Sequence, residues 1–243
     1  KMKRILLFSL ILSALLVSCT DKEDFSSDLS VRLTFSVDSV SMDTVFHHVA
    51  TRTYDFWVYN KSNSGVRIKE VRLNHPSLSG YRVNVDGNYV DSVAYDFEIR
   101  KEDSIRVFVE LTAPTATQSE PQRVEDQLVF ALESGVEQSL LLSAYSWKAQ
   151  FINEELVINK DTLINDRQPI VIRKGIVVAK GATLTLSHTQ LYFHDGAGIT
   201  VEGTLQADRC VFRGDRLDRM FSYPPYDRVS GQWEGIIIGA SSK

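Results

Sequence analysis

Charged side chains that could do chemistry gather in one stretch near the C-terminal end of the chain. The stretch contains Asp208, Arg209, Arg213, Asp215, Arg216, Asp218 and Arg219. Converging aspartates could hold Ca²⁺, which takes about six to eight oxygen ligands. Two carboxylates across a groove, such as Asp195 and Asp215, could hydrolyse a glycosidic bond. Here, however, arginines stand between the aspartates and would neutralise them in pairs. We therefore interpret the stretch as a salt-bridged loop and assign no catalytic residue to it.

The segment that follows is rich in aromatic residues. It reads Met220-Phe221-Ser222-Tyr223-Pro224-Pro225-Tyr226-Asp227, with Trp233 shortly after it. Exposed tyrosine and tryptophan rings offer flat apolar faces that stack on sugar rings or on protein partners. The alternative is that these rings cover the side of the fold. Tyr223, Tyr226 and Trp233 are therefore candidate ligand-binding residues, for a glycan or a protein.

The histidines do not predict a metal site. His47 and His48 are adjacent, and adjacent residues of a strand point to opposite faces, so the two rings could not easily bind one ion. The chain contains no phosphate-binding glycine loop, nucleophile elbow or zinc motif. We therefore expect no metal and no cofactor. The net charge of −4 argues against a nucleic-acid partner, which would favour a basic face.

The N-terminal residues predict export. A basic head, Lys1 to Arg4, precedes an apolar run from Ile5 to Val17, and the small residue Ser18 then precedes Cys19. This order is that of a secretory signal, and the run is shorter than the ~20 residues that a spanning helix needs. Cys210 is the only other cysteine, and we interpret it as a small buried apolar residue.

The end of this signal resembles the lipobox of bacterial lipoproteins. The resemblance implies that Cys19 is acylated, that residues 1–18 are removed, and that the mature chain is held by membrane lipid. An ordinary signal peptide is the alternative. The acidic residues 19–28 form a flexible tether, which also resembles the surface-export signal of Bacteroidetes lipoproteins. That likeness implies the outer face of the outer membrane, whereas a simple spacer would leave the periplasmic face open.

Residues 29–149 alternate with a period of two, as half-buried strands do. About seven short strands separated by turn residues predict a β-sandwich. The expected turns are a hairpin loop at residues 60–65, Asp86-Gly87, and residues 133–135. The stretches 58–65, 104–109 and 140–145 resemble the Ig-like class that includes major sperm protein and Hydin-type domains. The resemblance implies a spacer or adhesion module, and we assign no chemistry to this half.

Residues 150–243 contain a repeat. Ile176 corresponds to Ile199 and Val178 to Val201, and Gly181 is matched to Gly203, a spacing of 22 to 23 residues. Downstream, residues 191–193 are matched to residues 210–212. Short strands that recur at this period, with glycines at the corners, predict a solenoid. Two turns are clear, and a third begins near Trp233.

This half resembles the right-handed parallel β-helix of pectate-lyase-like proteins, and its later part resembles Bacteroidetes cell-surface β-helix lipoproteins. Because a solenoid needs about three repeats and a cap, we expect the chain to be the N-terminal fragment of a longer β-helix protein. The residue before Met2 also indicates a partial reading frame.

Together these features predict an all-β protein, with an Ig-like β-sandwich followed by the first turns of a right-handed parallel β-helix. We expect a membrane-anchored, surface-exposed lipoprotein that is a non-enzymatic binding or structural module. The alternative is a fragment of a carbohydrate-active enzyme, a polysaccharide lyase or glycoside hydrolase, whose active site lies beyond residue 243.

Overall fold

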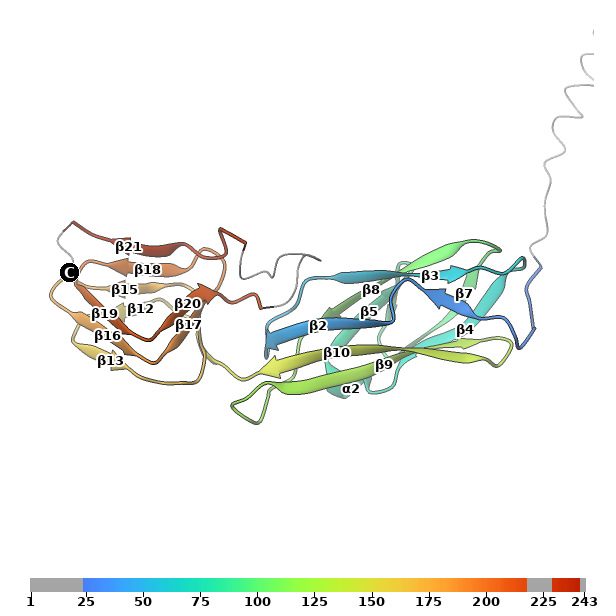
Figure 1. The fold of residues 1–243 in the computed structure, drawn as a ribbon, viewed down its shortest axis with the longest axis horizontal. Coiled ribbons are helices and arrows are strands. Elements are labelled where there is room, and N and C mark those ends of the chain that lie inside the picture. Colours follow the sequence, from blue (N-terminus) through green and yellow to red (C-terminus); the bar gives the residue numbers. More distant parts are fainter. Residues whose placement is uncertain (1–23, 218–228, 241–243) are drawn as a thin grey trace, which may run out of the picture.

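The computed structural model describes residues 24–217 and 229–240, and it is nearly all β. Two units follow one another along the chain and form an elongated molecule (Figure 1). A β-sandwich comes first and a three-sided β-solenoid second, as the sequence predicts. The described helix is a single turn, α2 (Pro76–Ser79).

The sandwich consists of two five-stranded sheets. The first sheet has the order β1 (Leu33–Phe35), β3 (Tyr54–Asn60), β8 (Ser104–Leu111), β5 (Tyr81–Val85) and β6 (Asn88–Val90). The second sheet has the order β2 (Ser39–Phe46), β10 (Glu137–Trp147), β9 (Gln122–Leu132), β4 (Val66–Leu73) and β7 (Val93–Ile99). All these pairs are antiparallel except β2 with β10, which run parallel. Strand β2 is therefore a parallel edge strand of the second sheet.

Alternation places the core between the two sheets. In β3 the side chains of Phe56 and Val58 are buried, whereas Asp55 and Trp57 point outward. The inward side chains of both sheets join in one hydrophobic cluster. Burying such apolar surface stabilises the fold by about 25 cal/mol per Å².

The sandwich has more strands than the seven that the sequence predicts. Strand β2 was missed because a bulge interrupts its alternation. Val40 and Met42 are buried, Asp43 has a φ of 59°, and the next buried side chain is Val45. The extra residue of a bulge shifts the period of two on which such a prediction depends.

The loop at residues 60–65 is not the hairpin loop that the sequence predicts, because it connects β3 in the first sheet to β4 in the second. The buried side chain of Asn60 explains the crossing. Its Nδ2 donates to the carbonyl oxygens of Ser64 (2.8 Å), Ile99 (3.1 Å) and Arg100 (3.0 Å). This one carboxamide thus ties the loop to the end of β7.

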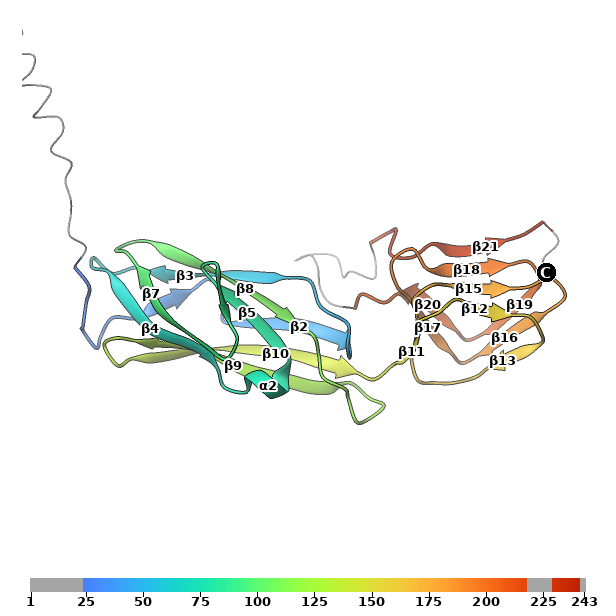
Figure 2. The ribbon, with the colours of Figure 1, turned by 180° about the vertical axis from the view of Figure 1, so that it is seen from behind.

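The solenoid is built from three parallel sheets, one for each side (Figure 2). The side nearest the sandwich contains β11 (Gln150–Ile152), β14 (Ile170–Ile172), β17 (Gln190–Phe193) and β20 (Val211–Gly214). The second side contains β12 (Leu156–Ile158), β15 (Ile176–Val178), β18 (Gly198–Val201) and β21 (Gly235–Ile238). The third contains β13 (Thr162–Ile164), β16 (Thr183–Ser187) and β19 (Thr204–Asp208). The described strands therefore make three complete turns and two sides of a fourth.

The register confirms part of the predicted repeat and corrects the rest. Ile176 stacks on Ile199 and Val178 on Val201, as predicted. Leu191, however, stacks on Phe212 and not on Cys210. A shift of two residues keeps every side chain on its face, so alternation could not reveal the error.

A complete turn, β11 to β13, precedes the two that the sequence shows. Its corners are Asn153-Glu154-Glu155 and Asn159-Lys160-Asp161, which contain no glycine to mark them. At a later corner the glycine is required, because a Cβ on Gly203 would lie 2.3 Å from the carbonyl oxygen of Ala182. The predicted repeat therefore began where the glycines begin.

The sandwich meets the side of the solenoid through a packed aromatic cluster. Phe46, at the end of β2, has its ring centroid 4.7 Å from that of Tyr192 and 5.6 Å from that of Trp147. Val171 and Ala149 are buried in the same cluster. The two units are thus joined by hydrophobic packing as well as by the chain.

His47 completes this junction. It follows β2 directly, as a strand-end histidine, but its ring is buried against Phe151 (5.1 Å between centroids). The backbone N–H of Ala149 donates to Nδ1 (3.3 Å), and burial lowers the pKa of His47. A neutral imidazole therefore packs at the junction, while His48 is exposed.

Candidate functional site

One edge of the solenoid carries the features that the sequence singled out. It is the corner between the first and second sides, where the described residues are 153–155, 173–175, 194–197, 215–217 and 229–234. The first three loops are short, and the fourth contains the aromatic segment. Paired residues of β15 and β18 are 23 positions apart, as in Ile176 and Ile199. Gly198 of β18 instead pairs with Gly235 of β21. The aromatic segment is therefore an insertion at this corner.

An open groove of about 610 Å³ follows the same corner. It is lined by Glu154, Glu155, Arg173, Lys174, His194, Asp195, Gly196 and Ala197. The backbone stacks regularly beneath it: Arg173 N–H donates to the carbonyl of Ile152, and His194 N–H to that of Ile172, each at 2.9 Å. Successive turns thus contribute two polar side chains each to a single surface.

The charges in the groove are partly paired between turns. Nζ of Lys174 lies 2.6 Å from Oε2 of Glu154, which belongs to the preceding turn. The Arg173 guanidinium lies over the Phe151 ring, 5.3 Å from its centroid. The groove therefore offers both signs of charge to a polar ligand.

His194 is held by a buried carboxylate. Its Nδ1 lies 2.7 Å from Oδ2 of Asp215, whose side chain is only 3% exposed, whereas that of His194 is 48% exposed. Burial raises the pKa of Asp215, and the hydrogen bond with His194 acts against this rise. The carboxylate fixes the orientation of the ring. Within the described residues Nε2 forms no hydrogen bond, so it is available to a ligand.

This pair changes the interpretation of the charged stretch. Asp208 pairs with Arg209 (3.5 Å), as the salt-bridged loop predicts, but Asp215 pairs with a histidine of the preceding turn. Asp215 is also buried, so it does not face the exposed Asp195 across the groove as a glycosidase pair would. Asp218 and Arg219 lie outside the described residues.

Of the candidate ligand-binding residues, Trp233 lies within the described part of the chain. Its ring stacks on Phe193, with 4.8 Å between the centroids and 15° between the planes. It is half-buried and packs against the solenoid core. One face of the indole thus covers the fold, and a binding role for Trp233 stays a prediction. Tyr223, Tyr226 and Cys19 lie outside the described residues.

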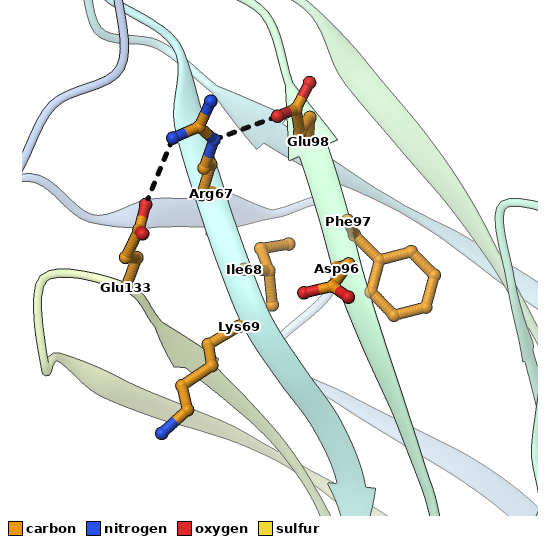
Figure 3. Close-up of a pocket in the computed structure, with 7 residues that line it drawn as sticks. All are labelled: Arg67, Ile68, Lys69, Asp96, Phe97, Glu98 and Glu133. Atoms are coloured by element: carbon orange, nitrogen blue, oxygen red, sulfur yellow. Dashed lines mark hydrogen bonds and ion pairs between the residues drawn. The ribbon is translucent and has the colours of Figure 1, made fainter.

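A second pocket, of about 550 Å³, lies on the second sheet of the sandwich (Figure 3). Figure 3 shows Arg67 between two carboxylates, with its nitrogens 2.9 Å from Glu98 and 3.6 Å from Glu133. The guanidinium also covers the ring of Phe25, 4.2 Å from its centroid. The charges of Arg67, Glu98 and Glu133 are therefore paired with one another, and the same guanidinium holds Phe25 of the N-terminal segment.

Within residues 24–217 and 229–240, no three histidine, cysteine or acidic side chains gather closely enough to hold a metal ion. None of the helices in these residues is long and apolar enough to cross a membrane.

No protein-family model and no curated protein matches this chain. Solved structures with similar folds include PapD-like domain 7 of human CEP192, at 14% identity and a TM-score of 0.32, covering 56% of this chain and 95% of that domain. A protein of unknown function from Porphyromonas gingivalis W83 has 16% identity and a TM-score of 0.35, covering 55% of this chain and 57% of its own. The E. coli chaperone DraB has 8% identity and a TM-score of 0.31, covering 49% and 55%. At these values the likeness says nothing about function.

The sequence did not predict the groove or the pair of His194 and Asp215. The available signal was the recurrence of charged residues at the solenoid period, with Glu154, Lys174 and Asp195 each 20 or 21 positions apart. That recurrence becomes visible only when the glycine-free first turn is included in the repeat.

Proposed function

We propose that the protein is a surface lipoprotein, anchored by acylated Cys19, that acts as a non-enzymatic binding or structural module. The supporting observation is the place where the described chain enters the sandwich. The described chain enters at the end of the sandwich remote from the solenoid (Figure 1), where the N–H of Gly65 donates to the carbonyl of Asp24 (2.8 Å). The sandwich then acts as a spacer that holds the solenoid away from the membrane.

The proposed ligand surface is the solenoid corner. The chain that carries Tyr223 and Tyr226 connects β20 to β21 at this corner, and Trp233, which follows it, stacks on Phe193. Arg173 and His194 would bind polar groups of the ligand, and the aromatic rings would stack on it. A glycan or a protein segment meets these requirements.

Replacement of the cysteines tests the anchor. The Cys19→Ser variant should lose radiolabelled palmitate and move from the detergent phase to the aqueous phase, whereas Cys210→Ser should retain both. Externally added protease should degrade the wild-type protein on intact cells. Labelled Cys19→Ser protein, or a protein that is protected on intact cells, would contradict the proposal.

Alanine replacements test the ligand surface. Tyr223→Ala with Tyr226→Ala should abolish retention on immobilised glycans or on a crosslinked partner without changing the melting temperature. Trp233→Ala should also lower the melting temperature, because it uncovers Phe193. Lost stability in the double tyrosine variant, with unchanged retention, would show that these rings serve packing alone.

A further inference from the structure

The outer face of the first sheet carries an unexpected row of aromatic side chains. Trp57 is 39% exposed and Tyr89 72% exposed, and Phe108 between them is half-buried. Their inward neighbours, such as Val58 and Val109, already fill the core. These three rings therefore contribute little to the interior of the sandwich.

Strand register brings the three rings into a diagonal row. Trp57 pairs with Arg106, Phe108 pairs with Asn84 of β5, and Asn84 in turn pairs with Tyr89 of β6. Phe108 lies diagonally from Trp57 and within reach of it, whereas Asn84 of β5 stands between Phe108 and Tyr89. The row thus crosses four neighbouring strands, β3, β8, β5 and β6.

Arg106 fixes part of the row. Its Cζ lies 5.4 Å from the centroid of Trp57 and 5.0 Å from that of Phe108. Its Nη2 lies 2.8 Å from Oδ2 of Asp55. The guanidinium and the rings of Trp57 and Phe108 are therefore ordered before any ligand arrives, which lowers the entropy cost of binding.

A small pocket of about 150 Å³ opens between two of the rings. It is lined by Thr53, Arg82, Val83, Asn84, Tyr89, Phe108 and Glu110. Its volume equals that of about five water molecules at ~30 Å³ each. A single sugar ring fits such a space, whereas a folded protein surface does not enter it.

The pocket offers both acceptors and donors of hydrogen bonds. Oε2 of Glu110 accepts from Nη2 of Arg82 (3.1 Å), and Oε1 accepts from the Thr53 hydroxyl. The hydrogen bond from Thr53 and the nearby Arg82 lower the pKa of Glu110, so it is ionised at neutral pH. Oδ1 of Asn84 accepts from the N–H of Gly87 (3.0 Å). Among the described residues Nδ2 of Asn84 has no acceptor, so this donor remains for a ligand.

The charges of the row and pocket balance. Arg82 pairs with Glu110, and Arg106 pairs with Asp55. A charged ligand would have to displace one member of a pair, whereas a neutral polyhydroxyl ligand can hydrogen-bond to their outer atoms. Charge complementarity thus favours a neutral ligand with hydroxyl groups and a flat apolar face.

We propose that this aromatic row and its pocket bind a neutral pyranose ring of a glycan. The C–H face of the sugar stacks on Tyr89 and Phe108, and its hydroxyl groups bond to Glu110, Arg82 and Nδ2 of Asn84. The inference deepens the proposed binding function by naming a ligand class, but it uses a surface of the sandwich and not the solenoid corner.

The test is affinity electrophoresis of the full mature chain in native gels that contain β-glucan, xylan, galactomannan or dextran. At least one polymer should retard the protein. Tyr89→Ala and Asn84→Asp should each weaken this binding at least tenfold. The second change keeps the acceptor for Gly87 but replaces the Nδ2 donor with a carboxylate oxygen and adds a negative charge. Tyr95→Ala is the matched control, because Tyr95 is 58% exposed but lies on β7 of the other sheet.

A second measurement separates binding from folding. Addition of the retarding polymer should change the fluorescence of Trp57, and Trp57→Phe should remove that change while the melting temperature stays constant. No retardation in any gel would overturn the proposal, as would retardation that Tyr89→Ala leaves intact or that Tyr95→Ala weakens equally. The anchoring of Cys19 and the solenoid corner are tested separately, for example with Arg173→Ala. Failure of the sugar-binding test would therefore not count against the proposed function.

Discussion

The sandwich and the solenoid are both built from short strands, but they assemble their cores differently. In the sandwich, Phe130 of β9 contacts Phe35 of β1 (5.2 Å between centroids), a residue far away in the sequence. In the solenoid, each inward residue stacks on its equivalent in the next turn, as Leu184 does on Leu205. The sandwich therefore presents broad sheet faces to solvent, whereas the solenoid presents rows of equivalent corner residues. The proposed sugar pocket and the charged groove follow from these two kinds of surface.

The largest expected effect is in the sandwich core. Phe130→Ala should lower the free energy of unfolding by about 3–5 kcal/mol, because it opens a cavity between the two sheets. Chemical denaturation monitored by circular dichroism checks this. Tyr145→Ala, on an exposed position of β10, is the control and should change little. A loss below about 1 kcal/mol for Phe130→Ala would show that the sheets do not share one core.

Asp126 should be the next most sensitive position. Its buried carboxylate accepts hydrogen bonds from the N–H groups of Asn74 and His75 and from the Ser79 hydroxyl. Asp126→Ala removes the acceptor of the His75 N–H and of the buried Ser79 hydroxyl and should cost about 3 kcal/mol. Ser79→Ala should cost less. Equal stability of wild type and Asp126→Ala in the same denaturation assay would contradict this role.

Two valines of the solenoid allow the stability of its interior to be compared with that of its junction with the sandwich. Val171 and Val178 are both fully buried, Val171 against the sandwich and Val178 inside the solenoid. Either change to alanine should cost about 1–2 kcal/mol. Of the two variants, only Val171→Ala should separate the melting transitions of the sandwich and the solenoid in calorimetry. The reason is that Val171 belongs to the solenoid and packs against the sandwich, whereas Val178 does not. Identical calorimetric profiles for the two variants would contradict the packed junction.

The smallest expected effect is a pH dependence of the junction. Burial lowers the pKa of His47 below its ordinary value of 6.5, and His48 and Lys148 lower it further. The neutral form therefore favours the folded state. Its stabilisation is fully present above pH 6.5 and is lost as the pH falls through this value toward the lowered pKa. Melting temperatures of wild type should fall between pH 7.5 and pH 5.5 more than those of His47→Gln. Parallel pH profiles would contradict this assignment.

The sequence predicts the fold class and the order of the two units well, because period-two alternation and the glycine corners are local signals. It does not predict β2, whose bulge at Asp43 breaks the alternation, or the first solenoid turn, whose corners lack glycine. It also misses the surfaces. His194 and Asp215, or Tyr89 and Phe108, are brought together by stacking and register, which depend on pairings between distant segments.

The most direct test concerns the packed junction that holds the sandwich and the solenoid in one arrangement. Spin labels on Asn63→Cys and Lys160→Cys, in a mature chain with the native cysteines replaced by serine, place one probe at the sandwich tip and one on a solenoid corner. The account predicts a single narrow distance distribution that Phe46→Ala broadens. A broad distribution in the unaltered junction would show that the units move independently and would contradict the account.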